Sequence, residues 1–209
     1  MFPSSPLEHP AAACILFAIL AVSMAAFSSQ ALFSRLMLHP VSIARERKYY
    51  LLVTHGFVHA NVAHLLFNTV SYTAIAFDVD GFLGPVDFLT VYFGSLVLGA
   101  LPSAWKNRSN PRYYAVGASG AIAGLLFSGM LFFPEGRIYL AFLPFAIPYP
   151  LFCAIFLVVS WYGARRNMGN IAHAIHLAGG IAGMLLTVIL RPDVLARFID
   201  ILSGIPPVE

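Results

Sequence analysis

The chain has 209 residues, of which 59% are hydrophobic and 10% are charged, and its formal net charge is +3. Soluble domains are about 45–50% apolar and about 25% charged, so this chain lacks the polar groups that a soluble surface needs, and its apolar excess is predicted to face lipid. The small net charge and the absence of long Lys/Arg runs exclude a nucleic-acid-binding protein.

Six apolar stretches follow one another along the chain. A bilayer core requires about 20 apolar residues per helix, so six such helices would use most of the sequence. We place them at residues 11–33, 62–79, 86–104, 117–133, 138–162 and 172–190. The first stretch is predicted to be a membrane helix rather than a secretory signal, because residues 1–10 contain no Lys or Arg. Residues 34–61 mix basic, aromatic and apolar side chains, which is typical of a segment at the membrane interface.

The stretches are separated by polar turns rich in Gly, Pro and Asp, at residues 78–85, 106–111, 134–136, 165–170 and 191–193. None of the stretches alternates between apolar and polar residues, so helices are predicted rather than barrel strands. Pro144, Pro148 and Pro150 are expected to kink the fifth stretch or to delay its start. The sequence therefore predicts an all-α membrane protein with six transmembrane helices, as a single domain over residues 1–209.

Four polar side chains stand out within these stretches. His64 and Asn68 lie on the second, Ser119 opens the fourth, and His176 lies on the sixth. Polar groups inside membrane helices are costly and usually face the protein interior. Because His64 and Asn68 are four residues apart, they share one helix face. These residues are the candidate site.

Glycines accompany the last two of these polar residues. Gly179 and Gly183 share the face of His176, and Gly120 and Gly124 form a small face beside Ser119. Glycine lets neighbouring helices approach closely. The fourth and sixth helices are therefore predicted to press together, which would bring Ser119 within hydrogen-bond reach of His176.

Such a contact predicts nucleophilic catalysis. A serine hydroxyl attacks poorly unless a base removes its proton, and a neutral imidazole is such a base and can then protonate a leaving amine. The resulting oxyanion needs donors, which His64, Asn68 and the Ser119 backbone amide would supply if the chain turns sharply at Gly117. The later stretches contain no carboxylate, so a Ser–His dyad is predicted rather than a triad.

These motifs resemble those of the rhomboid family of intramembrane serine proteases. The matching residues are Gly117-Ala118-Ser119-Gly120, His64 with Asn68, His176 with Gly179 and Gly183, and the segment from His55 to His59, over roughly residues 45–190. The resemblance implies a compact six-helix fold with a water-filled site that opens outward, a nucleophile at Ser119, a base at His176 and oxyanion donors at His64, Asn68 and the Ser119 amide.

The resemblance also implies that the substrates are transmembrane segments of other membrane proteins, which enter sideways near the second and fifth helices. It implies no metal and no organic cofactor. The protein is expected to be a multi-pass integral protein of the lipid bilayer, and its short length suits a bacterial plasma membrane. The sequence makes no prediction of oligomeric state.

Two positions depart from the family pattern. Many members carry a Trp-Arg pair in the first loop, where alignment from His55 places Tyr50 and Leu51 here. Some members have an aromatic residue four positions after the nucleophile, where this chain has Ala123, so support for the His176 ring must come from elsewhere.

The family orientation would leave nine of twelve Lys and Arg residues outside, although cytoplasmic loops usually carry the excess. We favour that orientation, because packing around the site can hold short loops.

Three alternative functions explain the sequence less well. A catalytically inactive relative that binds membrane proteins would typically have lost the Ser or the His, and this chain has both. A small metal-dependent protease or metal transporter is suggested by five histidines, His55, His59, His64, His173 and His176. A zinc peptidase requires a Glu beside a pair spaced like His55 and His59, no Glu lies near either cluster, and a metal would not explain Ser119 or Asn68. A structural or transport protein would use its polar residues as helix contacts, which does not explain their order.

Overall fold

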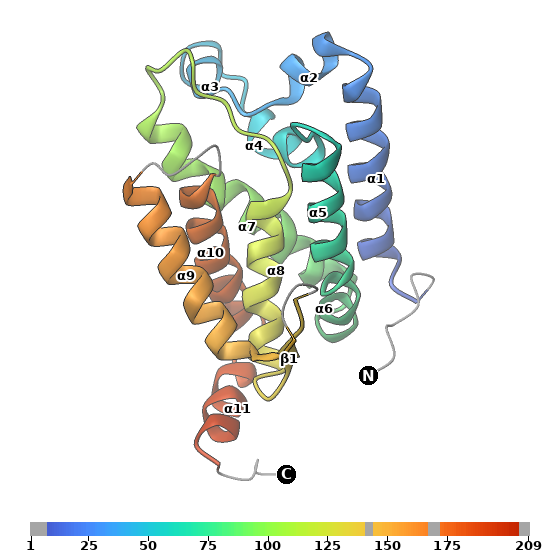
Figure 1. The fold of residues 1–209 in the computed structure, drawn as a ribbon, viewed down its shortest axis with the longest axis vertical. Helices are drawn as coiled ribbons and strands as arrows, with labels where there is room; N and C mark the ends of the chain where they lie inside the picture. Colours follow the sequence, from blue (N-terminus) through green and yellow to red (C-terminus); the bar gives the residue numbers. More distant parts are fainter. Residues whose placement is uncertain (1–7, 141–143, 167–171, 205–209) are drawn as a thin grey trace.

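The computed structural model describes residues 8–140, 144–166 and 172–204, and it is mostly helical (Figure 1). In chain order, the helices are α1 (Pro10–Phe27), α2 (Gln30–Leu36), α3 (Pro40–Glu46), α4 (Leu51–Thr54), the 3₁₀ turn η1 (His55–Phe57), α5 (Val62–Thr73), α6 (Ala76–Leu83), α7 (Pro85–Lys106), α8 (Ser119–Phe132), α9 (Tyr149–Arg166), α10 (His173–Leu190) and α11 (Asp193–Leu202). Strands β1 (Arg137–Ile138) and β2 (Ile147–Pro148) pair antiparallel.

Within the described residues, four segments are long and apolar enough to cross a membrane: α1, α5 with α6 (Val62–Leu83), α7 and α10. A fifth apolar helix, α8, is shorter. Helix α9 ends in Arg165 and Arg166 and falls outside this set. The chain is therefore an integral membrane protein with several candidate spans, as its composition predicts.

Two of the predicted boundaries are wrong. The first helix ends at Phe27 rather than at residue 33, because Ser29 caps a separate helix, with its hydroxyl accepting from the Leu32 amide at 3.2 Å. The fifth stretch does not begin as a helix at residue 138, since Ile138 pairs with Ile147 in the strand pair. Helix α9 instead begins at Tyr149, the late start that its prolines predict, and residues 141–143 of that predicted span lie outside the described residues.

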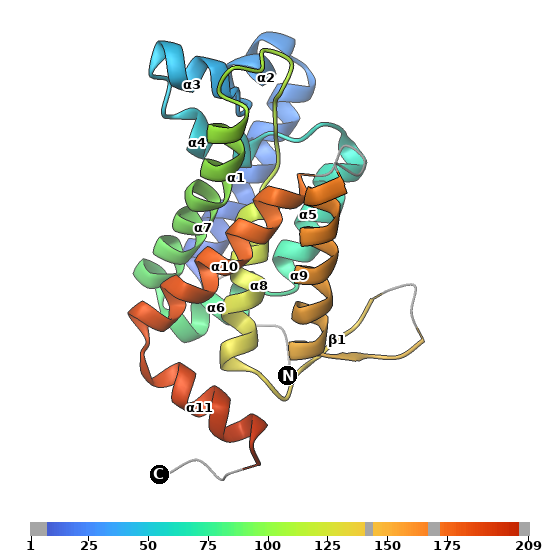
Figure 2. The same ribbon diagram turned by 90° about the vertical axis from the view of Figure 1, so that its left-hand side faces the viewer.

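Helix α8 is the centre of the bundle. Every residue from Gly120 to Phe132 is buried except Leu126, which is half-buried. Figures 1 and 2 show α7 and α10 beside α8, with α1 and α5 toward one side of the bundle and α9 toward the other. A helix that is apolar on all faces is stable only when other elements surround it. The 14 residues of α8 are surrounded in this way.

Buried polar contacts fasten α1 to this core. The Tyr72 hydroxyl donates to the Ala12 carbonyl at 2.9 Å, and the Ala12 amide donates to the Asp80 carboxylate at 3.0 Å. All three residues are buried. Since unpaired polar groups are costly in an apolar interior, these bonds fix the depth of α1 against α5 and α6.

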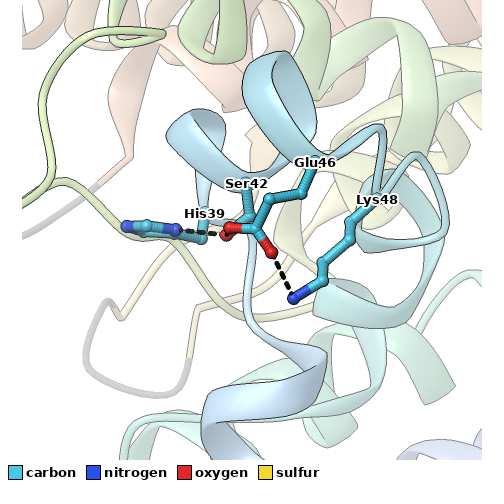
Figure 3. A network of polar contacts seen from close by, with 4 residues as sticks. All are labelled: His39, Ser42, Glu46 and Lys48. Atoms are coloured by element: carbon cyan, nitrogen blue, oxygen red, sulfur yellow. Dashed lines mark hydrogen bonds and ion pairs between the residues drawn. The ribbon is translucent and has the colours of Figure 1, made fainter.

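Charge is distributed very unevenly between the two ends of the molecule. Nine exposed basic residues lie on segments toward the upper side of Figure 1, which are α2, α3 and the loop after it, the end of α7 and the loop after it, and the end of α9. They are Arg35, Arg45, Arg47, Lys48, Lys106, Arg108, Arg112, Arg165 and Arg166. In the described part of the chain, the acidic residue at this end is Glu46, which pairs with Lys48 at 2.7 Å and accepts from the Ser42 hydroxyl at 2.9 Å (Figure 3). The segments toward the opposite side, which are the residues just before α1, α6, the start of α7, the turn from α8 into β1, and α11 with the turn before it, carry three basic and seven acidic residues. They are Arg137, Arg191 and Arg197, and Glu8, Asp78, Asp80, Asp87, Glu135, Asp193 and Asp200.

Candidate active site

Ser119 and His176 are in direct contact although 57 residues separate them. Ser119 is the first residue of α8, and His176 lies in the first turn of α10. The His176 Nε2 and Ser119 Oγ atoms are 2.6 Å apart, and both side chains are half-buried. A neutral His176 with its lone pair on Nε2 accepts the serine proton in this geometry. The pair therefore has the arrangement of a hydroxyl and its base.

The helices that carry this pair pack backbone against backbone. A Cβ added at Gly179 would lie 2.9 Å from the Gly120 carbonyl carbon, and one at Gly183 would overlap the Cα and carbonyl oxygen of Gly124. The glycines of the two predicted faces thus meet each other. Because the contacting atoms belong to the backbone, which cannot move aside as a side chain can, the spacing between α8 and α10 is fixed at the closest possible approach.

A sharp turn precedes Ser119. Gly117 has φ +111°, which side-chain-bearing residues rarely adopt, and its added Cβ would lie 2.8 Å from the His64 ring. The Gly117 amide donates to the His55 carbonyl at 2.8 Å. The first amide in α8 with an intrahelical bond is that of Ile122, to Ala118. The Ser119 amide therefore lies among the free N–H groups of a helix start, which favour negative charge.

The predicted oxyanion donors lie on α5, beside this turn. Asn61 caps α5 by accepting from the His64 amide at 2.8 Å, and the His64 ring packs against Gly117. Asn68 is buried, and its Nδ2 donates to the His64 carbonyl at 3.0 Å. That bond uses one of the two Nδ2 hydrogens. The structure thus brings His64 to the turn and leaves Asn68 one donor hydrogen to offer.

Sequence reasoning missed the residue that lies beside the His176 ring. Ala123 is buried and offers no aromatic surface, but Phe156 of α9 has its ring centroid 6.1 Å from that of His176. Phe156 also contacts Phe127 of α8, with ring centroids 6.1 Å apart. No motif marks Phe156, since it lies on a helix whose sequence carries no site residue. Here α9 supplies the aromatic neighbour that position 123 lacks.

We expect Phe156→Leu to lower kcat by roughly 2- to 10-fold, the worth of one aromatic contact, because the His176 ring would lose a neighbour that restricts its orientation. The check is the turnover rate of the Ser119–His176 pair at saturating substrate. Phe17→Leu, on the exposed face of α1, is the matched control and should leave kcat unchanged. A kcat for Phe156→Leu equal to that of the wild type would mean that the His176 ring is held without it.

Three other histidines lie near the site, and one of them, His173, packs edge-on against His176 with ring centroids 6.3 Å apart. His55 is buried, and its Nδ1 donates to the Leu51 carbonyl at 3.0 Å. His59 lies beside His64, with ring centroids 5.0 Å apart, and contacts Ser23. Among the described residues, no three His, Cys, Asp or Glu side chains converge in a way that could hold a metal ion.

Comparison with known proteins gives consistent matches. The family described as the Rhomboid domain matches residues 46–193. "Rhomboid protein 1, mitochondrial" of Saccharomyces cerevisiae is 27% identical over 139 residues, covering 64% of this chain and 40% of that protein. "Putative rhomboid protease YdcA" of Bacillus subtilis is 32% identical over 142 residues, covering 64% of each chain. The chain thus spans less than two thirds of the length of either relative.

Proposed function

This chain belongs to the rhomboid family, and from that membership we propose that it is an intramembrane serine endopeptidase that cleaves transmembrane segments of other membrane proteins. The observation that carries the proposal is the 2.6 Å contact between Ser119 Oγ and His176 Nε2 at the start of a buried helix. An intramembrane serine that only served packing would have no need of an imidazole aligned with its hydroxyl.

The reaction follows from the positions of these atoms. His176 Nε2 takes the proton as Ser119 Oγ attacks the carbonyl carbon of the scissile bond. The oxyanion accepts hydrogen bonds from the Ser119 amide, the His64 ring and the Asn68 amide. His176 then protonates the leaving amine, the C–N bond breaks, and an ester to Ser119 remains. A water molecule, deprotonated by His176, hydrolyses this ester and restores the hydroxyl.

Asn68→Ala is expected to lower kcat in a graded way, by up to roughly 10²–10³-fold, the scale for removal of one oxyanion donor. The measurement is kcat together with the melting temperature, since Asn68 is buried and bonded to its own helix. Thr69→Val removes the neighbouring hydroxyl at similar volume and should leave kcat unchanged. If Asn68→Ala melted at a lower temperature but cleaved at the wild-type rate, Asn68 would be purely structural.

The membrane arrangement is part of the proposal. We propose that α8 and α9 cross the bilayer together with the four candidate spans, giving six spans in one domain over residues 1–209. The end with α2 and α3 would face outward across a bacterial plasma membrane. The test labels single cysteines at Ser109 and Ser203, which lie at opposite ends, with an impermeant maleimide in intact cells that produce a Cys14→Ser, Cys153→Ser protein. Labelling at position 203 alone would show the opposite orientation, which is the one that the distribution of basic residues favours.

The decisive test of function uses purified protein in detergent. A reporter whose transmembrane segment holds small, helix-destabilising residues near its outer end is incubated with the enzyme, and the products are identified by mass spectrometry. We expect one cut within or at the edge of that segment, unchanged by a metal chelator. If folded protein neither cleaves the reporter nor reacts with a serine-directed fluorophosphonate at Ser119, the proposed protease function is wrong. The chain would then be an inactive relative that binds membrane proteins.

A further inference from the structure

Helix α1 contributes a buried serine to the surroundings of the active site, although it lies outside residues 46–193, which the family matches. Ser23 lies near the end of α1 and is fully buried. Its hydroxyl donates to the Phe57 carbonyl at 2.9 Å, and its Oγ lies 2.8 Å from Nδ1 of His59. Both partners belong to the segment that lies between α4 and α5.

These contacts favour the His59 tautomer that carries its hydrogen on Nδ1. When the Ser23 hydroxyl donates to the Phe57 carbonyl, its Oγ accepts from His59, and Nδ1 carries the hydrogen. Nε2 then holds a lone pair. The Ala118 amide, 3.5 Å away, donates to it. With this tautomer, a continuous chain of hydrogen bonds runs from Ala118 through His59 and Ser23 to Phe57.

His59 occupies the junction of this chain with the site. Its side chain is fully buried and packs edge-on against the His64 ring. Burial lowers the pKa of His59 to about 4, so the ring is neutral near neutral pH and one of its two nitrogens is an acceptor. Ala118 immediately precedes Ser119, and the amide before it, that of Gly117, donates to the His55 carbonyl at 2.8 Å. The two amides that lead into the nucleophile are thus held by one segment, residues 55–59.

We propose that Ser23 is a positioning residue for the active site: it fixes the tautomer and ring orientation of His59, which holds the Ala118 amide and with it the turn that presents Ser119. This inference rests on the proposed function. Its consequence is that α1 is part of the working enzyme, because removal of one hydroxyl on α1 would let the peptide planes next to the nucleophile rotate.

The kinetic test compares Ser23→Ala with Ser23→Thr, which keeps the hydroxyl, and with Ser34→Ala, a control at an exposed serine of α2. We expect Ser23→Ala to lower kcat about tenfold, the effect of one net hydrogen bond, with KM unchanged, and Ser23→Thr to restore most of the loss. Ser34→Ala should match the wild type. An active wild type with an equally active Ser23→Ala variant would overturn the inference and leave the proposed function standing, whereas an inactive, unlabelled wild type would overturn the function itself.

A second measurement needs no activity and covers the case in which Ser23→Ala folds poorly. Nitrogen NMR of protein labelled with [¹⁵N]histidine distinguishes protonated from bare ring nitrogens, and a His59→Gln sample assigns the His59 signals. We expect His59 of the wild type to carry its hydrogen on Nδ1 and none on Nε2. A hydrogen on Nε2 would break the proposed chain at Ala118 and overturn the inference. In Ser23→Ala, the His59 signals should shift toward a mixture of the two tautomers.

Discussion

Ser119→Ala is expected to reduce cleavage by roughly 10⁴-fold or more, and His176→Ala to do the same, while the double variant is no slower than either single one. The reason is that the two side chains act as a unit. Without the hydroxyl there is no nucleophile, and without the imidazole at 2.6 Å the hydroxyl keeps its proton. Removal of either side chain therefore abolishes the rate enhancement of the pair, and removal of the second side chain causes no further loss of rate.

The measurement is the initial rate of reporter cleavage for the wild type, both single variants and the double variant, with melting temperatures recorded for each. Ser128→Ala is the matched control, because Ser128 lies on the same helix nine residues after Ser119, is buried, and accepts from Thr187 at 2.8 Å. It should lower stability and leave kcat near the wild-type value. Undiminished cleavage by pure Ser119→Ala protein would show that Ser119 is not the nucleophile.

The central part of the site was predictable because it depends on short-range patterns. The spacing of Gly179 and Gly183 from His176, and of Gly120 and Gly124 from Ser119, determines which helix faces are small. Two glycine-lined faces on neighbouring helices pack together because their backbones can approach closely. The contact between residues 57 positions apart thus follows from local periodicity. The turn at Gly117 was predictable for a similar reason, since a sharp bend before a helix requires a conformation that glycine adopts readily.

The supports of the site were not predictable, because they come from helices that carry no motif. Phe156 is one of many aromatic residues in an apolar stretch, and only the packing of α9 against α8 and α10 selects it. Ser23 looks like any small polar residue in a membrane helix, and its role depends on His59, which belongs to a different segment. The end of α1 was missed for a simpler reason. Apolar residues continue beyond Ser29, and hydropathy alone does not register a cap.

Gly183→Val is expected to have the largest effect on stability, lowering it by roughly 3 kcal/mol or more, because a Cβ at this position would overlap backbone atoms of Gly124. Helix α10 would have to move away from α8, and the movement would be felt at the hydrogen bond between Ser119 and His176. A displacement of about 1 Å at reacting groups costs on the order of 10²-fold in rate, so folded variant protein should also be nearly inactive.

The experiment measures thermal unfolding in detergent and cleavage by the folded fraction, for Gly183→Ala and Gly183→Val side by side. Both quantities should fall further for Val than for Ala. The control is Ala178→Val on the same helix, where the added methyl groups point into an open apolar groove lined by Leu98 and Leu185 instead of toward α8. That variant should unfold and cleave much as the wild type does. If Gly183→Val retained full activity, the distance between α8 and α10 would not control the distance between the nucleophile and its base, and the glycine contacts would serve assembly of the bundle alone.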